Sequence, residues 1–204
     1  MRTDMKRSIV RALASCALVL PSALFAAGGG ALPYHYKPDA GNEASLQRGA
    51  QLFMNYCSGC HSLEFLRYNR MAADLEIPED LMMENLVFTD AKPGEHILSA
   101  MPEDAAAGWF GAAPPDLSLT ARSRGPSWVY SYLLSFYLDD SRPMGVNNTV
   151  LPGASMPHVL APLEGWKALD EHADSHGEAA GGHGESHGPA FIQVEDGSLD
   201  HDEY

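Results

Sequence analysis

Apolar residues recur at spacings of three and four in the segment after residue 42, which is the pattern of a helix with one buried face. These apolar positions are Leu46, Ala50, Phe53 and Cys57. Asn42 precedes them as a candidate N-cap, so we expect a helix that begins after Asn42 and reaches Cys57. A short helical stretch is expected after His61, through residues 65–66.

Two further segments have the same kind of pattern. Residues 75–88 combine Pro78 with apolar residues on one face, and they predict a helix with Met82 and Met83 as core candidates. Pro126 stands at the expected first turn of another helix. Its apolar stripe consists of Val129, Leu133 and Phe136, flanked by Trp128, Tyr132 and Tyr137.

The segments between these helices are rich in turn-forming residues. Prolines at 93, 102, 114 and 115 predict turns across residues 90–120, with short helices near 96–100 and 105–109. Residues 142–160 are expected to be mostly irregular, and another short helix is expected around Trp166. The pattern therefore predicts an all-α fold with long irregular loops.

Both ends of the chain differ in composition from the middle. Residues 1–26 carry Arg2, Lys6 and Arg7 before an apolar run, and small residues follow at 26–28. This is typical of a cleaved secretory signal peptide, followed by a lead-in segment at 27–41. Near the other end, residues 171–188 are rich in His and Gly, which predicts a flexible insertion without a defined metal site, followed by a C-terminal segment at 189–204.

The charge balance is strongly acidic. The 204 residues include 13 Lys and Arg and 27 Asp and Glu, for a formal net charge of −14. Residues 1–26 hold four of the basic residues and one acidic residue, so the mature chain is more acidic still, with 9 basic and 26 acidic residues. Such a surface suits a basic partner and disfavours nucleic acid.

Cys57-Ser58-Gly59-Cys60-His61 is the attachment pattern of a c-type haem. Each thiol can form a thioether to the porphyrin, and His61 would be the proximal iron ligand. Two other readings of paired cysteines are less favoured. A structural zinc site needs two more ligands at matching spacing, and the part of the chain expected to be ordered has no second cysteine pair or regularly spaced histidine pair. A thioredoxin-like dithiol needs alternating strands and helices around it, whereas the flanking segments predict helices and loops.

The residue on the other side of the iron determines the chemistry. A methionine gives a centre suited to electron transfer, whereas an open position suits gas binding or peroxide chemistry. The candidates in loops are Met101, Met144 and Met156, with His158 as a further possibility. Met156 is the best placed, because the nearby prolines and glycine can hold a non-helical loop against the haem.

Several segments in order along the chain resemble the cytochrome c1 family, the c-haem subunit of the ubiquinol-cytochrome c reductase (bc1) complex, in its proteobacterial form. The resemblance extends over positions 34–204. The segments are 55–62 around the haem motif, Tyr68-Asn69-Arg70, Trp109 to Ser118 with Pro114-Pro115-Asp116-Leu117-Ser118, Gly145 to Asn148, and Pro152 to His158. The segment at 114–118 and the distant methionine loop are more specific than the haem motif itself.

The resemblance implies a role for each matching residue. Cys57 and Cys60 would hold one covalent haem c, and His61 and Met156 would be its iron ligands. Pro114 and Pro115 would form a wall of the haem pocket. An arginine after the 116–118 segment would pair with a haem propionate, with Arg124 as the first choice and Arg122 as the second.

The resemblance also implies a fold and a function. The fold would be a class I cytochrome c-like helical domain at residues 42–170. The chain would accept electrons from a Rieske iron-sulfur protein and pass them to a soluble or membrane-bound cytochrome c, beside cytochrome b, and would not be an enzyme by itself. The alternatives are a free periplasmic monohaem cytochrome c, or a haem sensor or enzyme with an open sixth site.

Location follows from the same resemblance. The haem domain is expected on the periplasmic face of the bacterial inner membrane. Cytochrome c1 normally ends in a transmembrane helix, and outside the signal segment this sequence has no apolar run of about 20 residues. We therefore expect residues 189–204 to lead to an anchor that the chain lacks, through truncation or otherwise.

Overall fold

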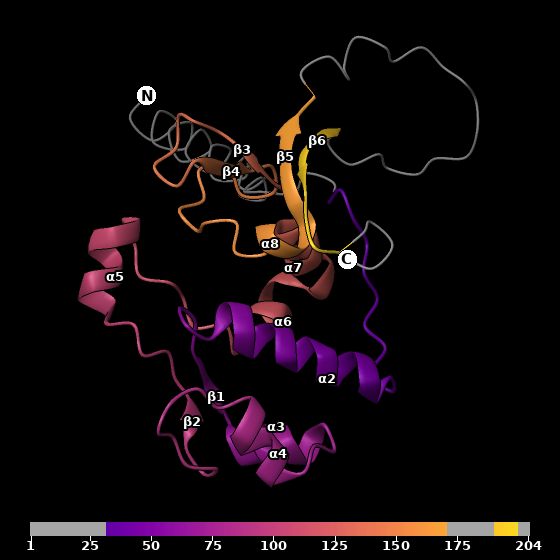
Figure 1. The fold of residues 1–204 in the computed structure, drawn as a ribbon, viewed down its shortest axis with the longest axis vertical. Helices are drawn as coiled ribbons and strands as arrows, with labels where there is room; N and C mark the ends of the chain where they lie inside the picture. Colours follow the sequence, from indigo (N-terminus) through magenta and orange to yellow (C-terminus); the bar gives the residue numbers. More distant parts are fainter. Residues whose placement is uncertain (1–31, 171–189, 200–204) are drawn as a thin grey trace, which may run out of the picture. The chain divides into compact units, whose positions relative to one another are not determined.

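The computed structural model describes residues 32–170 and 190–199, which belong to one compact unit, Leu32–Tyr204 (Figure 1). The expected signal peptide and His-rich insertion lie outside the described residues. The helices are α2 (Glu43–Leu52), the π-helix η1 (Phe53–Cys57), α3 (Tyr68–Asp74), α4 (Glu79–Asn85), α5 (Glu103–Phe110), α6 (Thr120–Arg124), α7 (Pro126–Leu133) and α8 (Ala161–Glu164). The strands are β1 (Leu63–Arg67), β2 (His96–Ile97), β3 (Phe136–Leu138), β4 (Val146–Asn148), β5 (Gly165–Leu169) and β6 (Phe191–Asp196). Over these residues, no helix is both long and apolar enough to cross a membrane.

The helix expected after Asn42 is confirmed. The Asn42 side chain accepts a hydrogen bond from the Ser45 backbone N–H at 3.1 Å and caps α2. After Leu52 the helix widens into η1, where Ser58 N donates to the Phe53 carbonyl at 3.0 Å. A π-turn of this kind is frequent at functional sites, and here it ends at Cys57.

The other periodic segments give helices that are shorter than expected. Pro78 precedes α4, and Met82 within it is 0% exposed, so this predicted core position is confirmed. The other candidate, Met83, is only half-buried. Pro126 is the first residue of α7, as its fixed φ favours. The helix ends at Leu133, and Phe136 belongs to strand β3. The predicted helix at 105–109 lies inside α5.

An all-α fold is not what the structure shows, because the described residues contain three two-stranded antiparallel sheets besides the helices. The helix expected after His61 is wrong: Leu63–Arg67 is strand β1. The helix expected at 96–100 is also wrong, because His96–Ile97 is strand β2, which pairs with β1. Each strand obtains its backbone hydrogen bonds from a partner about 30 residues away, a tertiary effect that local propensity does not contain.

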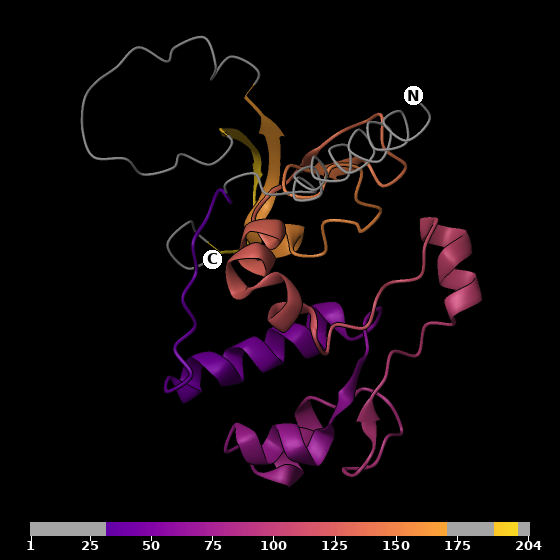
Figure 2. The same ribbon diagram turned by 180° about the vertical axis from the view of Figure 1, so that it is seen from behind.

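The helix expected around Trp166 is wrong for a similar reason. Trp166 lies in β5, which pairs with β6 from beyond the undescribed segment. The two strands lie side by side when seen from either face (Figure 2). Gly165 begins β5 at φ +88°, and a Cβ there would come within 2.1 Å of the Glu195 carbonyl oxygen, so the close approach requires glycine. The third sheet pairs β3 with β4, and β4 lies inside the otherwise irregular segment 142–160.

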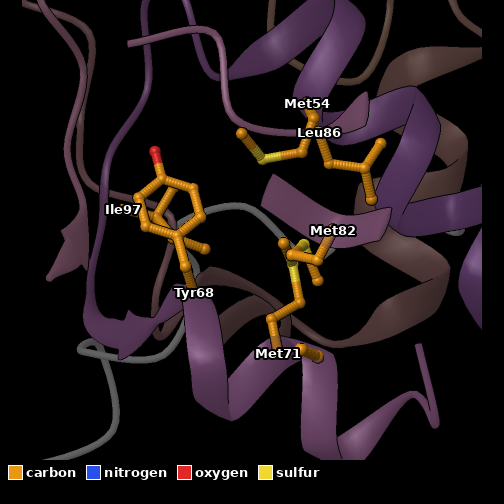
Figure 3. Close-up of a cluster of buried hydrophobic side chains, with 7 residues drawn as sticks. Met54, Tyr68, Met71, Met82, Leu86 and Ile97 are labelled. Carbon is orange, nitrogen blue, oxygen red and sulfur yellow. The ribbon is translucent and has the colours of Figure 1, made fainter. Parts of the chain in front are cut away.

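A hydrophobic cluster forms around α3 and α4 (Figure 3). Its buried members are Met54, Tyr68, Met71, Ala72, Met82, Leu86 and Ile97. Met54 belongs to η1 and lies three positions before Cys57, whereas Ile97 comes from β2. The cluster therefore supports the helix end that carries the first cysteine and the strand pair that follows the histidine.

Candidate haem site

The two cysteines of the attachment motif lie in a tight turn at the end of η1. The Cys57 carbonyl accepts hydrogen bonds from the N–H groups of Cys60, at 3.0 Å, and His61, at 2.9 Å. Both thiols are free and partly buried. Burial, and then the neighbouring Cys60, raises the pKa of the Cys57 thiol. The turn thus presents two unpaired thiols next to the histidine, as attachment of one porphyrin requires.

His61 is held in one orientation. The residue is 8% exposed, and its Nδ1 lies 2.7 Å from the Pro115 carbonyl oxygen. A carbonyl can only accept, so Nδ1 carries the proton and Nε2 is the nitrogen with a free lone pair. A histidine that binds a metal through one ring nitrogen usually donates a hydrogen bond from the other, as His61 does here.

Met156 lies in the loop between β4 and α8 and is half-buried. Tyr132 of α7 donates its hydroxyl to the Met156 sulfur at 3.5 Å. Burial raises the pKa of Tyr132 to about 12, so the hydroxyl keeps its proton and remains a donor at neutral pH. A thioether sulfur has two lone pairs, and one stays available for a metal.

Two asparagine side chains hold the start of the methionine loop. Asn148 is 0% exposed; it donates to the Tyr132 carbonyl at 2.7 Å and accepts from the N–H groups of Val150 and Leu151. The Asn147 side chain accepts from Gly153 N at 2.8 Å. These amides replace the regular ladder of a strand, which is how an irregular segment keeps a defined path.

The end of the same loop is packed by rings and buried polar groups. His158 stacks on Phe136 with ring centroids 5.1 Å apart and meets Trp166 edge-on at 5.8 Å. Its Nε2 lies 3.0 Å from Glu164 Oε2, although the two atoms are not aligned as a hydrogen bond. Glu164 forms an ion pair with Lys167, which also donates to the Leu134 carbonyl at 2.8 Å. The sixth-ligand alternative His158 is thus engaged within its own cluster.

The arginines expected to bind a propionate lie in α6, and both are exposed. The Arg124 guanidinium carbon is 4.7 Å from the centre of the Trp128 ring. Trp128 in turn stacks on Tyr132, with ring centroids 5.2 Å apart, and Tyr132 contacts Met156. The Trp128 ring therefore lies between Arg124 and Tyr132.

The remaining expected residues are the two prolines and the other two methionines. Pro115 contacts His61 through its carbonyl and Pro114 is half-buried beside it, whereas Met101 and Met144 are half-buried elsewhere. Across residues 32–170 and 190–199, no hydrogen bond or ring contact joins His61 to Met156. The same residues contain no group of three or more His, Cys, Asp or Glu that could hold a metal ion.

Sequence reasoning missed several residues that build this site. Tyr132 was expected only as part of an apolar helix, and Asn147, Asn148 and Asp116 were noted within the family-like segments without a role. Their signal was the position of polar residues next to a proline-rich or glycine-rich loop. Which backbone group each one contacts is visible only in the folded chain.

Two free thiols, a histidine with Nε2 available and a loop methionine are the donor set of a c-type cytochrome, and the residues present fit a covalently attached haem. The chain belongs to the cytochrome c1 family: the model described as "Cytochrome C1 family" matches residues 39–162. Proteins of this family carry one covalent haem c.

Two curated relatives that are named cytochrome c1 agree with this assignment. The chain is 56% identical over 153 residues to "Cytochrome c1" of Allochromatium vinosum, covering 75% of this chain and 63% of the relative. It is 38% identical over 118 residues to "Cytochrome c1" of Rhodospirillum rubrum, covering 49% of this chain and 43% of the relative. A third relative, 45% identical over 132 residues, is the "Ammonia monooxygenase gamma subunit" of Nitrosomonas europaea, covering 65% and 56%. The chain thus spans less than two thirds of the length of each of these relatives.

Proposed function

We propose that this chain is the electron-transfer haem subunit of a cytochrome bc1 complex. It accepts electrons from a Rieske iron-sulfur protein and passes them to a cytochrome c, next to cytochrome b on the periplasmic face of the inner membrane. The observation that carries the proposal is that the family match, residues 39–162, includes both the attachment motif and the Met156 loop. The acidic surface is consistent with a basic electron acceptor.

In this proposal, Cys57 and Cys60 form the two thioethers, His61 is the proximal ligand and Met156 is the distal ligand. The bound haem supplies a one-electron couple. The chain's own residues prepare the two ligands: the Pro115 carbonyl orients the His61 ring, and the Tyr132 hydroxyl occupies one lone pair of the Met156 sulfur, so the other lone pair would be available to the haem. The protein itself makes or breaks no bond in a substrate.

Pro114 and Pro115 are proposed to form a wall of the haem pocket. The His61 hydrogen bond supports this for Pro115, since it brings residue 115 next to the proximal ring. Arg124 is proposed to pair with a propionate, ahead of Arg122. The Arg124 guanidinium lies over the Trp128 ring, and Trp128 stacks on Tyr132, the partner of Met156. This link to the Met156 loop supports Arg124 as the first choice.

Deletion of the gene tests the function in the whole complex. We expect the mutant's membranes to lose quinol:cytochrome c reductase activity, and expression of the full-length gene to restore it. Succinate:quinone reductase activity in the same membranes is the control for intact membranes. Reductase activity that persisted in the deletion strain would contradict the proposal.

Purification of the full-length protein separates this function from the alternative of a free periplasmic carrier. A bc1 subunit is expected to co-purify with cytochrome b and a Rieske protein from detergent-solubilised membranes. Recovery in the periplasmic fraction without either partner would favour the free carrier instead.

A further inference from the structure

Two segments separated by about 50 residues run side by side at the proximal histidine. They are residues 61–65, which follow the attachment turn, and residues 115–118. The Leu117 N–H donates to the Ser62 carbonyl at 2.9 Å, and His61 Nδ1 lies 2.7 Å from the Pro115 carbonyl oxygen. The Phe65 N–H donates to the Ser118 hydroxyl at 3.1 Å.

Asp116 connects these contacts. One carboxylate oxygen, Oδ2, accepts from the Glu64 N–H at 2.8 Å, and the other, Oδ1, accepts from the Ser118 N–H at 2.9 Å. Hydrogen bonds to an ionised carboxylate are stronger than neutral ones. Partial desolvation raises the pKa of Asp116, but the hydrogen bonds from Glu64 and Ser118 lower it, and the net shift is downward. The carboxylate is therefore an acceptor from both segments at neutral pH.

The position of Asp116 gives it control over the acceptor of His61. The Pro115 carbonyl belongs to the peptide plane that joins Pro115 to Asp116. The proline ring fixes φ of Pro115, so the direction of that carbonyl depends on ψ of Pro115 alone. The hydrogen bond from the Glu64 N–H to the Asp116 carboxylate, called the clamp below, holds Asp116, the residue at the other end of this peptide plane. The clamp thereby restricts ψ of Pro115.

We propose that Asp116 is a positioning residue that sets the electron-donating strength of the proximal histidine through the Pro115 carbonyl. The inference rests on the proposed function, because it needs His61 to ligate the iron. A hydrogen bond from Nδ1–H makes the imidazole a better donor and stabilises the oxidised iron. Loss of the clamp weakens that bond and raises the reduction potential.

The test compares two substitutions at Asp116 in the purified full-length holoprotein. Asp116→Asn removes the charge and one acceptor, whereas Asp116→Glu keeps the charge but displaces it by one methylene. We expect both substitutions to raise the reduction potential by at least about 28 mV. This corresponds to a threefold change in the one-electron equilibrium constant, at 59 mV per tenfold change. Redox titration followed by haem absorbance measures the potential.

Asp39→Asn is the matched control. Asp39 also accepts from the N–H two residues later, at 3.0 Å from Gly41, but it is exposed and lies in the lead-in segment. Its potential should equal the wild-type value. Hydrogen exchange provides a second readout: the Glu64 amide should lose protection in the Asp116 variants and keep it in Asp39→Asn.

The outcomes separate this inference from the proposed function. Wild-type potentials in both Asp116 variants, with haem covalently attached, would overturn the positioning role and leave the electron-transfer function standing. A shift in Asp116→Asn alone would overturn it too, because charge and not geometry would then be the cause. If neither variant yields holoprotein, the comparison of Glu64→Pro with Glu64→Ala decides, because both remove the Glu64 charge and only the proline removes the N–H that donates to Asp116. A higher potential in Glu64→Pro supports the clamp, and equal potentials refute it. A wild-type chain without covalent haem would refute the proposed function and the inference with it.

Discussion

The proximal and distal sides of the site are built in different ways. On the proximal side, residues 61–65 and 115–118 are joined directly, with a backbone group taking part in each of the four hydrogen bonds between them. On the distal side, the loop that carries Met156 is held by side chains from α7, β3, β4, α8 and β5. Three of the four proximal bonds need one side chain each, from His61, Asp116 and Ser118, whereas the distal loop draws on side chains from five elements. We therefore expect more positions on the distal side to be sensitive to substitution.

The largest effect is expected at the attachment turn. The double substitution Cys57→Ser and Cys60→Ser removes both thioether-forming groups and should abolish covalent haem binding. Extraction with acidified organic solvent measures this, because a non-covalent haem is extracted and a covalent one stays with the protein. The single substitution Cys57→Ser is the control and should retain haem through Cys60. Haem that resisted extraction from the double variant would contradict the assignment.

Met156→Leu tests the distal ligand. The substitution keeps most of the side-chain volume but removes the sulfur, and a methionine ligand raises the potential of a haem. The reduction potential should therefore fall by at least about 59 mV, which corresponds to a tenfold change in the one-electron equilibrium constant. Met144→Leu is the matched control, since Met144 is also half-buried in the irregular segment. A fall in Met144→Leu, with none in Met156→Leu, would move the assignment to Met144.

A smaller effect is expected from the side chain that holds the distal loop. Asn148→Ala removes three hydrogen bonds of a fully buried side chain, one to Tyr132 and two from Val150 and Leu151. At about 1 kcal/mol for each bond, the free energy of unfolding should fall by about 3 kcal/mol. Chemical denaturation of the holoprotein measures this.

Asn85→Ala is the control for that measurement. Asn85 is exposed, and its amide donates to the Leu81 carbonyl within α4. Its substitution should change stability by about 0.5 kcal/mol or less. Equal losses in the two variants would show that the distal loop does not depend on Asn148.

Sequence patterns predicted best where the cause is local. The capping side chain of Asn42, the proline at the start of α7 and the buried Met82 each depend on a few neighbouring residues. The strand after His61 was not predictable in this way, because it forms by pairing with residues 96–97. Trp166 similarly lies in a strand whose partner is beyond residue 189.

The site shows the same division between local and long-range causes. The attachment motif is local and was recognised from its spacing, whereas the acceptor of the His61 ring is the backbone carbonyl of Pro115. A backbone carbonyl has no residue-type signal, so the sequence offered only the wall of prolines that the family resemblance implied. Asp116 and Tyr132 likewise act on groups that the fold brings to them from distant segments.

Carbon monoxide binding to the reduced, native full-length holoprotein tests the central claim most directly. In the proposed function, His61 from the proximal segment and Met156 from the distal loop would both hold the haem iron and leave no position open. The absorption spectrum of the reduced protein should therefore not change when carbon monoxide is added, while Met156→Leu should form a carbon monoxide complex. A complex in the wild-type protein would show an open sixth position and contradict the electron-carrier account.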